Sequence, residues 1–256
     1  MKKVFITDLD RTMVHSENPD FICVEKEGER KITYMTKESI NHLNELLSRK
    51  DFVFVPCSMR NYAQTMRINF ISNNMPRYMI CENGAKIYVD GNLDEKWSLY
   101  MRSIINSDYV IEGINKIKAL KYNFRDIKNI DDFYIAVSFY DEKESDASYS
   151  EISSIFSHPY NVFKVGRKIF IIHNKIDKYY AVKYLVENYD IKCFITSGDT
   201  EVDKKFTRLG KCVLPKHASF THDNAYITSK PGIHSTDEIL DFVDNFFYGN
   251  EKNIGG

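Results

Sequence analysis

Two aspartate-bearing segments, one near each end of the chain, contain the residue types best suited to chemistry. A short apolar run leads to Asp8 and Asp10, and another leads to Asp199 and Asp203. Such runs are typical of buried strands, and ligands of open parallel sheets bind at the carboxyl ends of the strands. Carboxylates at two such ends can converge on one hard cation, and Mg²⁺ favours oxygen ligands of this kind. The sequence therefore favours chemistry on a phosphorylated compound.

Four segments, in order along nearly the whole chain, resemble the four motifs of the haloacid dehalogenase superfamily of phosphatases. They are Asp8-x-Asp10-x-Thr12, the strand Val53–Val55 followed by Ser58 and Arg60, Ile176-Asp177-Lys178, and Gly198-Asp199-x-x-x-Asp203. The segment from Ile80 to Ala85 resembles a segment typical of one branch of the superfamily. Members of this branch, the Cof-like and sucrose-phosphate-phosphatase-like enzymes, have a large α/β cap between the second and third motifs. A single motif of this kind is weak, but four in the expected order identify the chain as a member of the superfamily.

The sequence departs from the family pattern at two positions. Arg11 stands where the family usually has glycine, so the loop after the first motif loses a flexible residue. Val202 stands where the capped branch often has asparagine, which removes a polar group near the expected metal site. Neither departure removes a carboxylate of the motifs.

The resemblance implies a role for each aspartate of the first motif. Phosphoester hydrolysis needs a nucleophile, a proton donor for the leaving group and compensation of phosphoryl charge. Asp8 is expected to attack phosphorus and form an aspartyl-phosphate, while Asp10 is expected to protonate the leaving oxygen and later activate water. The alternative interpretation is a pair of loop carboxylates that cap a helix or turn.

The same resemblance implies a Mg²⁺ site. Asp8, the backbone carbonyl of Asp10 and Asp199 are the expected ligands, and Asp203 is expected to ligate directly or through water. The alternative is that Asp199 and Asp203 cap and charge the start of a helix predicted over Glu201–Leu209.

Further residues are expected to hold the phosphoryl group. Ser58 would donate a hydrogen bond, or it is a simple turn residue at the end of a strand. Lys178 would neutralise charge on Asp8 and the phosphoryl group, and Lys175 is its rival three residues away. Thr12 is expected to steady the loop through its hydroxyl and to touch the phosphoryl group.

Two arginines complete the set of candidates. Arg11 and Arg60 could contact the anion, because a guanidinium pairs well with phosphate. For both, a solvated surface side chain is an equally good interpretation. His15 lies near the first motif, but nothing else in the sequence marks it as a base.

Composition excludes several classes of protein. The 256 residues are 43% hydrophobic and 28% charged, with a net charge of −1, so no basic field attracts nucleic acid or a membrane surface. Five scattered cysteines without a Cys-x-x-Cys pair favour reduced thiols and a cytoplasmic location. No apolar run approaches ~20 residues, so no membrane span is expected.

The pattern of predicted elements indicates an α/β core interrupted by an insertion. Residues 1–91 and 173–256 alternate strands and helices, which predicts a Rossmann-like parallel sheet. Residues 92–172 contain consecutive strands, which predicts an inserted α+β cap with an antiparallel sheet. Within the core, helices are predicted from Thr36, as N-cap, to about Ser48 and from Asn61 to before Pro76. Residues 15–35 are predicted to be irregular apart from Phe21–Val24, and to form a flap over the site.

These observations predict a Mg²⁺-dependent phosphatase of a small phosphorylated metabolite, with a sugar phosphate favoured because a large cap excludes macromolecules. The alternatives are a phosphomutase of the same fold and a non-catalytic phosphate-binding regulatory module. The expected partner is a small phosphorylated substrate, and the sequence leaves the oligomeric state open.

Overall fold

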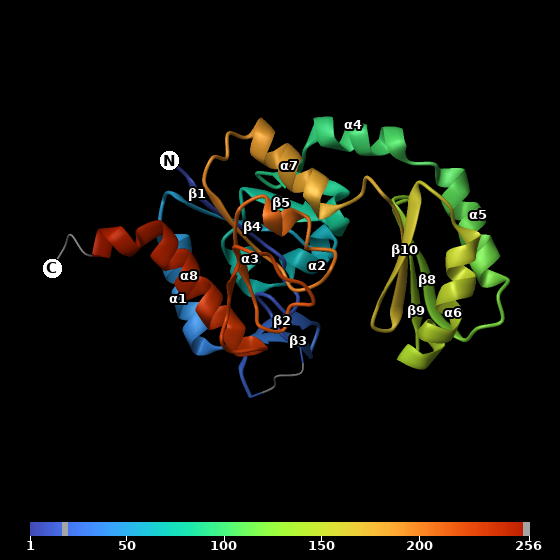
Figure 1. The fold of residues 1–256 in the computed structure, drawn as a ribbon, viewed down its shortest axis with the longest axis horizontal. Helices are drawn as coiled ribbons and strands as arrows, with labels where there is room; N and C mark the ends of the chain where they lie inside the picture. Colours follow the sequence, from blue (N-terminus) through green and yellow to red (C-terminus); the bar gives the residue numbers. More distant parts are fainter. Residues whose placement is uncertain (17–19, 253–256) are drawn as a thin grey trace. The chain divides into compact units, whose positions relative to one another are not determined.

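A parallel sheet lies at the centre of the first of the two units into which the chain divides (Figure 1). The computed structural model describes residues 1–16 and 20–252, and within them this sheet has five strands in the order β14-β13-β12-β1-β4. The strands are β1 (Lys3–Thr7), β4 (Phe52–Pro56), β12 (Phe194–Ser197), β13 (Lys211–Leu214) and β14 (Tyr226–Ile227). Neighbouring strands all run parallel. The chain passes from β1 to β4 on one side and later to β12 on the other, so a ligand crevice is expected beside β1.

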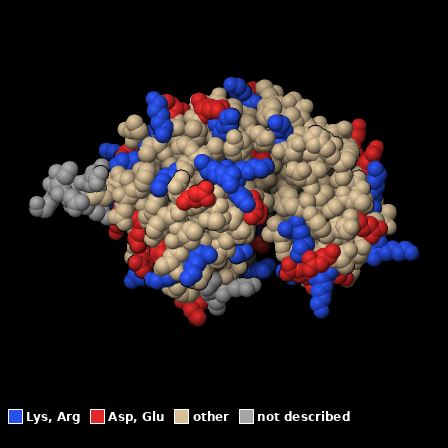
Figure 2. Space-filling model, in the orientation of Figure 1, with Lys and Arg blue, Asp and Glu red and all other residues tan. Residues whose placement is uncertain are grey.

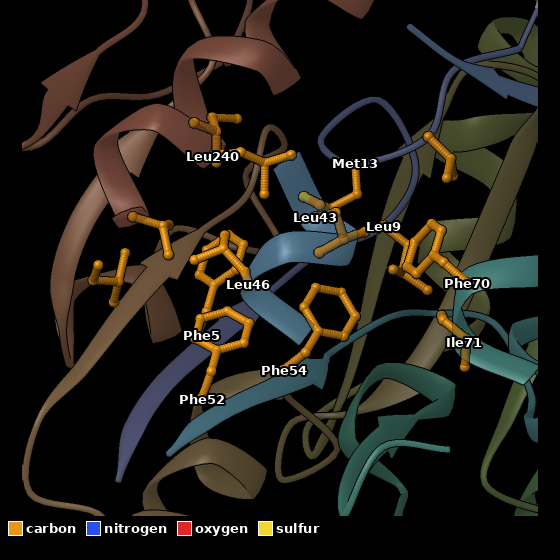
Figure 3. Close-up of a cluster of buried hydrophobic side chains, with 14 of the residues drawn as sticks. Phe5, Leu9, Met13, Leu43, Leu46, Phe52, Phe54, Phe70, Ile71 and Leu240 are labelled. Carbon is orange, nitrogen blue, oxygen red and sulfur yellow. The ribbon is translucent and has the colours of Figure 1, made fainter. Parts of the chain in front are cut away.

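Helices α1 (Lys37–Ser48) and α8 (Ile233–Lys252) pack side by side against this sheet (Figure 1). The predicted N-cap of α1 is confirmed, because Thr36 Oγ1 accepts a hydrogen bond of 2.9 Å from the Ser39 amide. Leu43 and Leu46 of this helix pack into one buried cluster with Phe5 and Phe54 of the sheet, as Figure 3 shows. Truncating one such leucine to alanine typically costs about 2–5 kcal/mol.

The segment that the sequence predicts to be irregular contains a β-hairpin. Strands β2 (Ile22–Glu27) and β3 (Arg30–Met35) pair antiparallel, with a register shift around Glu25. The expectation of irregular structure was wrong here, because the buried charge of Glu25 and the bulge beside it interrupt the alternation that marks a strand. The part of this segment at residues 17–19 lies outside the described residues.

The helix predicted from Asn61 to before Pro76 is also wrong in part. Asn61 is an N-cap, as predicted, but the segment forms two short helices, α2 (Tyr62–Met66) and α3 (Asn69–Asn73). Between them Ile68 has extended dihedral angles and makes an antiparallel bridge with Glu25 of the hairpin. This long-range pairing overrides the local helical preference.

Three further strands follow beside the parallel sheet. They are β5 (Tyr78–Cys81), β6 (Lys86–Val89) and β7 (Asn92–Leu93), which pair antiparallel in that order, with the short 3₁₀ helix η1 (Glu82–Gly84) after β5. Asp90 and Gly91 form the turn between β6 and β7, and both have positive φ, as an Asp-Gly turn favours. A parallel bridge between Cys57 and Ile80 places β5 next to the end of β4.

The second unit, Lys96–Ile176, is an insertion with its own core. Every residue of it is described. Its sheet has the order β10-β11-β9-β8 with antiparallel pairing throughout, as predicted for an α+β insertion. The elements are α4 (Glu95–Ile104), α5 (Ser107–Lys118), β8 (Phe124–Ile130), β9 (Tyr134–Phe139), α6 (Glu142–Ile155), β10 (Tyr160–Val165) and β11 (Lys168–His173). Its ends lie a few residues later than the predicted boundaries of 92 and 172.

The surface is mixed in charge. On the face that Figure 2 shows, acidic and basic side chains are interspersed, in keeping with the net charge of −1. Among the helices of residues 1–16 and 20–252, none is both long and apolar enough to cross a membrane.

His15 ties the loop after β1 to the start of α8. Its ring is 4% exposed, and its Nε2 lies 2.9 Å from Thr236 Oγ1. Thr236 in turn donates to the Thr12 carbonyl at 2.8 Å, so the ring nitrogen is the donor of the pair. Burial, together with the neighbouring His217 and Arg11, lowers the pKa of His15 to about 4. His15 is therefore a neutral histidine that links the loop after β1 to α8.

We expect His15 to make the folded state sensitive to acid. Its native pKa of about 4 lies below the ordinary value of 6.5, so between these pH values the unfolded chain binds more protons. The free energy of unfolding therefore falls as the pH drops from about 6.5 to 4, by up to about 3 kcal/mol from this residue. Denaturant titrations of wild type and His15→Gln across this range should show the difference between them shrinking toward acid pH. Parallel stability curves would contradict the assignment.

Candidate active site

The sheet register brings Asp8 and Asp199 together. Thr7, the last residue of β1, is the register partner of Ser197, the last residue of β12. The Asp8 amide donates to the Ser197 carbonyl at 2.9 Å, which continues the ladder to the residue that carries the carboxylate. Because both strands end at the same edge of the sheet, the side chains that follow them converge.

A buried cluster of charged groups forms at this edge. Carboxylate oxygens of Asp8, Asp199 and Asp203 lie within 4.8 Å of one another, and all these residues are buried. Lys178 is 1% exposed, and its Nζ lies 2.6 Å from Asp8 Oδ1 and 2.6 Å from Asp203 Oδ1. The carboxylates outnumber the ammonium by two, so a divalent cation would balance the buried charge.

Lys178 is held in place by the start of α7 (Lys178–Asn188), of which it is the first residue. Asp177 caps this helix by accepting a hydrogen bond of 2.9 Å from the Tyr179 amide. Gly84 of η1 has a φ of +96° and approaches so closely that a Cβ there would lie 2.8 Å from the Asp177 carbonyl oxygen. Glycine at this position thus lets the segment after β5 pack against the helix start that presents Lys178.

The surroundings shift the pKa values of the cluster. Burial raises the pKa of Asp8 well above its usual value, Lys178 opposes this shift, and Asp203 and Asp199 add to it. Burial and Asp203 likewise raise the pKa of Asp199 to about 7. Burial alone would lower the pKa of Lys178, but Asp203 and Asp8 outweigh it and raise that pKa. Burial and mutual repulsion thus disfavour the ionised forms of Asp8 and Asp199, and a bound cation would offset both effects.

The donor set fits Mg²⁺. All the candidate ligands are oxygens, which this hard cation prefers. Asp199 Oδ2 is buried, accepts no hydrogen bond from any residue in the described part of the chain, and lies 3.3 Å from Arg11 Nε. Asp8 and Asp199 thus offer oxygens to a shared cation.

Asp203 is already engaged on both carboxylate oxygens. Oδ1 accepts from Lys178, and Oδ2 accepts from the amides of Asp199 and Thr200 at 3.2 and 3.0 Å and from the Thr200 hydroxyl at 3.0 Å. A Cβ on Gly198 would lie 2.5 Å from Asp203 Cβ, so the loop requires glycine there. The hydrogen bonds of Asp203 thus fix the conformation of the loop that carries Asp199.

The helix predicted over Glu201–Leu209 is wrong. The chain turns tightly from Thr200 and forms the short 3₁₀ helix η2 (Phe206–Arg208). The inward-facing carboxylate of Asp203 binds the loop amides and so competes with regular helical bonding. Asp199 and Asp203 therefore do not cap or charge the start of an α-helix, because no α-helix forms over residues 201–209.

Ser58 and Thr12, the predicted phosphate contacts, are both buried. Ser58 follows the end of β4, next to β1, and is 1% exposed. Its Oγ accepts a hydrogen bond of 3.2 Å from the Arg60 amide and retains its own hydrogen for donation. The buried Thr12 Oγ1 makes no hydrogen bond within residues 1–16 and 20–252. Both hydroxyls can therefore serve a ligand.

Arg11 occupies a left-handed backbone conformation, with a φ of 61°. This conformation is costly for a residue other than glycine. The Arg11 amide donates to the Val14 carbonyl at 2.8 Å, and His217 Nε2 donates to the Arg11 carbonyl at 2.8 Å. His217 Nδ1 accepts from the Gly232 amide, which fixes this tautomer. His217 thus stabilises the loop that contains Arg11, and no feature of the sequence indicated this role.

Asp10 and Arg60 form a bidentate pair. Arg60 Nε donates to Asp10 Oδ2 at 2.8 Å, and Nη2 donates to Oδ1 at 2.7 Å. The Asp10 side chain is 53% exposed, unlike that of Asp8. The guanidinium that the sequence offers as an anion contact is thus paired with Asp10 in this structure.

Comparison with known proteins agrees with this geometry. The family model described as sucrose-6F-phosphate phosphohydrolase matches residues 1–213. The sucrose-phosphatase of Synechocystis sp. PCC6803, solved with sucrose and phosphate, is 16% identical, with 95% of this chain and 99% of that chain covered and a TM-score of 0.67. A search of curated proteins by sequence finds no match.

Two other solved structures share the fold. The C-terminal domain of trehalose-6-phosphate phosphatase from C. albicans is 13% identical over 96% of this chain and 93% of its own, with a TM-score of 0.60. A Thermotoga maritima protein is 18% identical over 94% and 97%, with a TM-score of 0.67. At these identities the structures show the fold, and it is the family model over residues 1–213 that shows the family. The chain therefore belongs to the sucrose-6F-phosphate phosphohydrolase family and is a phosphatase of the haloacid dehalogenase superfamily.

Proposed function

We propose that this protein is a Mg²⁺-dependent phosphatase that hydrolyses a small sugar phosphate through an aspartyl-phosphate on Asp8. The observation that carries the proposal is the buried cluster in which Lys178 Nζ lies 2.6 Å from Asp8 Oδ1 and the carboxylate of Asp199 lies beside it. The activity on a sucrose phosphate for which the family is named, and the sucrose bound to the Synechocystis enzyme, support a sugar phosphate as the substrate class.

Asp8 is the proposed nucleophile. Lys178 fixes its carboxylate through Oδ1 and offsets the negative charge that gathers as carboxylate and phosphoryl group approach. Asp203, which holds Lys178 from the other side, keeps the ammonium in place. Mg²⁺, held by Asp8, the Asp10 carbonyl and Asp199, would supply further stabilisation of the phosphoryl charge when bound.

Asp10 is the proposed acid and base. It donates a proton to the departing sugar oxygen and later removes one from the water that hydrolyses the aspartyl-phosphate. Its half-exposed carboxylate suits this task, because a leaving group and a water molecule must both reach it. Ser58 and Thr12 are proposed to donate hydrogen bonds to phosphoryl oxygens.

A phosphate-release assay tests the proposal directly. The panel should contain sucrose 6F-phosphate, trehalose 6-phosphate, glucose 6-phosphate, a nucleoside monophosphate and p-nitrophenyl phosphate, each with Mg²⁺ and with chelator. We expect stoichiometric phosphate from at least one sugar phosphate in Mg²⁺. Transfer of the phosphoryl group to a second hydroxyl of the substrate, without phosphate release, would indicate a mutase instead.

Replacing Asp8 by asparagine should abolish turnover. The amide cannot attack phosphorus and is a poorer Mg²⁺ ligand, so kcat should fall at least ~10³-fold. Circular dichroism and thermal unfolding should show that the variant remains folded. Near-wild-type activity in a folded sample would refute the role of Asp8.

Metal removal should abolish activity, and Ca²⁺ should inhibit. Mg²⁺ enforces a tight octahedron, whereas Ca²⁺ accepts more oxygens at longer distances and would displace Asp8. Isothermal titration should show that Asp199→Asn weakens Mg²⁺ binding independently of any assay of turnover. Full activity in excess chelator would contradict the metal site.

The inserted unit is proposed to act as a cap that selects the sugar. The core holds phosphate and metal with its own strand ends, so the insertion is left to recognise the leaving group. Joining Glu95 to Asp177 by a short linker should preserve turnover of p-nitrophenyl phosphate and reduce the preference among sugar phosphates. An unchanged preference would show that the insertion does not set specificity.

A further inference from the structure

Glu25, in the hairpin of β2 and β3, is a buried charge that the proposed chemistry leaves unused. Its side chain is 0% exposed. Its Oε2 lies 2.9 Å from Arg60 Nη1 and accepts from Thr33 Oγ1 at 3.0 Å, while its Oε1 lies 3.0–3.1 Å from Arg67 nitrogens. A buried carboxylate costs several kcal/mol unless it is paired and hydrogen-bonded as this one is.

Glu25 is linked to the reacting groups through Arg60. The same guanidinium donates from Nε and Nη2 to Asp10 and from Nη1 to Glu25. The Arg60 side chain is 11% exposed and that of Asp10 is 53% exposed. A planar guanidinium held at its buried end by Glu25 presents its other edge to Asp10 in one plane. The orientation of an exposed carboxylate is thereby fixed from the protein interior.

We propose that Glu25 is a positioning residue that fixes the Asp10 carboxyl group, through Arg60, in the orientation for proton transfer to the leaving oxygen. The proposed role belongs to the Glu25 side chain and not to the hairpin as a whole. The bridge between Glu25 and Ile68 holds the strand backbone beside the segment that follows Arg60, so the geometry is fixed in the main chain as well. This inference rests on the proposed role of Asp10 as the acid.

The leaving group provides a readout that separates positioning from general structural damage. A sugar alkoxide leaves with difficulty unless it is protonated, whereas p-nitrophenolate leaves without a proton. The ratio kcat/KM covers the steps up to loss of the leaving group, so later hydrolysis of the aspartyl-phosphate does not affect it. A misplaced Asp10 therefore lowers kcat/KM for a sugar phosphate and spares that for p-nitrophenyl phosphate.

Glu25→Gln is the informative variant, because it keeps the shape and removes the charge. One carboxylate oxygen becomes an amide group that faces an arginine donor. With sucrose 6F-phosphate and glucose 6-phosphate as probes, we expect kcat/KM to fall roughly 10–100-fold, and less than about 3-fold with p-nitrophenyl phosphate. Equal losses on both kinds of substrate would overturn the proposal.

The matched control is Glu27→Gln. Glu27 lies on the same strand and pairs with Arg67, but within the described residues it forms no ion pair with Arg60. We expect this variant to leave kcat/KM unchanged on both kinds of substrate. A loss equal to that of Glu25→Gln would assign the effect to the hairpin as a whole and overturn the proposal.

A double-mutant cycle with Asp10→Asn tests whether Glu25 acts through Asp10. In that background, Glu25→Gln should have no further effect on kcat/KM for the sugar phosphates. An additive loss would overturn the positioning role while leaving the proposed function intact. Wild-type activity of Asp10→Asn would instead overturn the acid role of Asp10, and the positioning role with it.

Arg60→Lys provides an independent variant should Glu25→Gln fail to fold. Lysine keeps the positive charge beside Glu25 but cannot form the bidentate fork to Asp10. We expect the same selective loss on sugar phosphates and the same absence of effect in the Asp10→Asn background. An equal loss on p-nitrophenyl phosphate would overturn the proposal.

Discussion

The ammonium of Lys178, buried between Asp8 and Asp203, is the interaction on which the site depends. It joins three segments that are distant in sequence: the end of β1, the start of α7 and the loop after β12. Removing the ammonium would leave buried carboxylates without their counter-charge, which typically costs several kcal/mol. The same contact that assembles the core therefore presents the proposed nucleophile, and stability and chemistry depend on one group.

The parallel sheet supplies the geometry within which this contact forms. Pairing of Thr7 with Ser197 places the residues that follow them at one edge, where the strand order reverses. The loop after β12 folds tightly around Asp203. Asp203 lies so close to Gly198 that no side chain fits at position 198. The buried carboxylates exceed the ammonium in charge, and burial together with this excess raises the pKa values of Asp8 and Asp199. A divalent cation is the natural complement.

The two aspartates of the first motif have opposite surroundings. Asp8 is buried beside an ammonium, which suits a nucleophile that must be held still and shielded from water. Asp10 is half-exposed, which suits a group that exchanges protons with a leaving group and with water, and the fork of Arg60 orients it. The hairpin of β2 and β3 contributes to this difference, because its Glu25 holds the far end of the Arg60 side chain.

The sequence by itself determined the parallel core with its antiparallel insertion, and it placed Asp8 and Asp199 at strand ends. Apolar runs followed by carboxylates are local patterns, and local periodicity and capping determine strands and the start of α1. Only the tertiary structure decided that Arg60 pairs with Asp10, that Glu25 is buried behind it, and that both oxygens of Asp203 are engaged. The ion pair between Arg60 and Glu25 and the bridge at Ile68 join residues far apart in the chain. No local propensity encodes such pairings, because the charges attract strongly only after the fold brings them together in a low-dielectric interior.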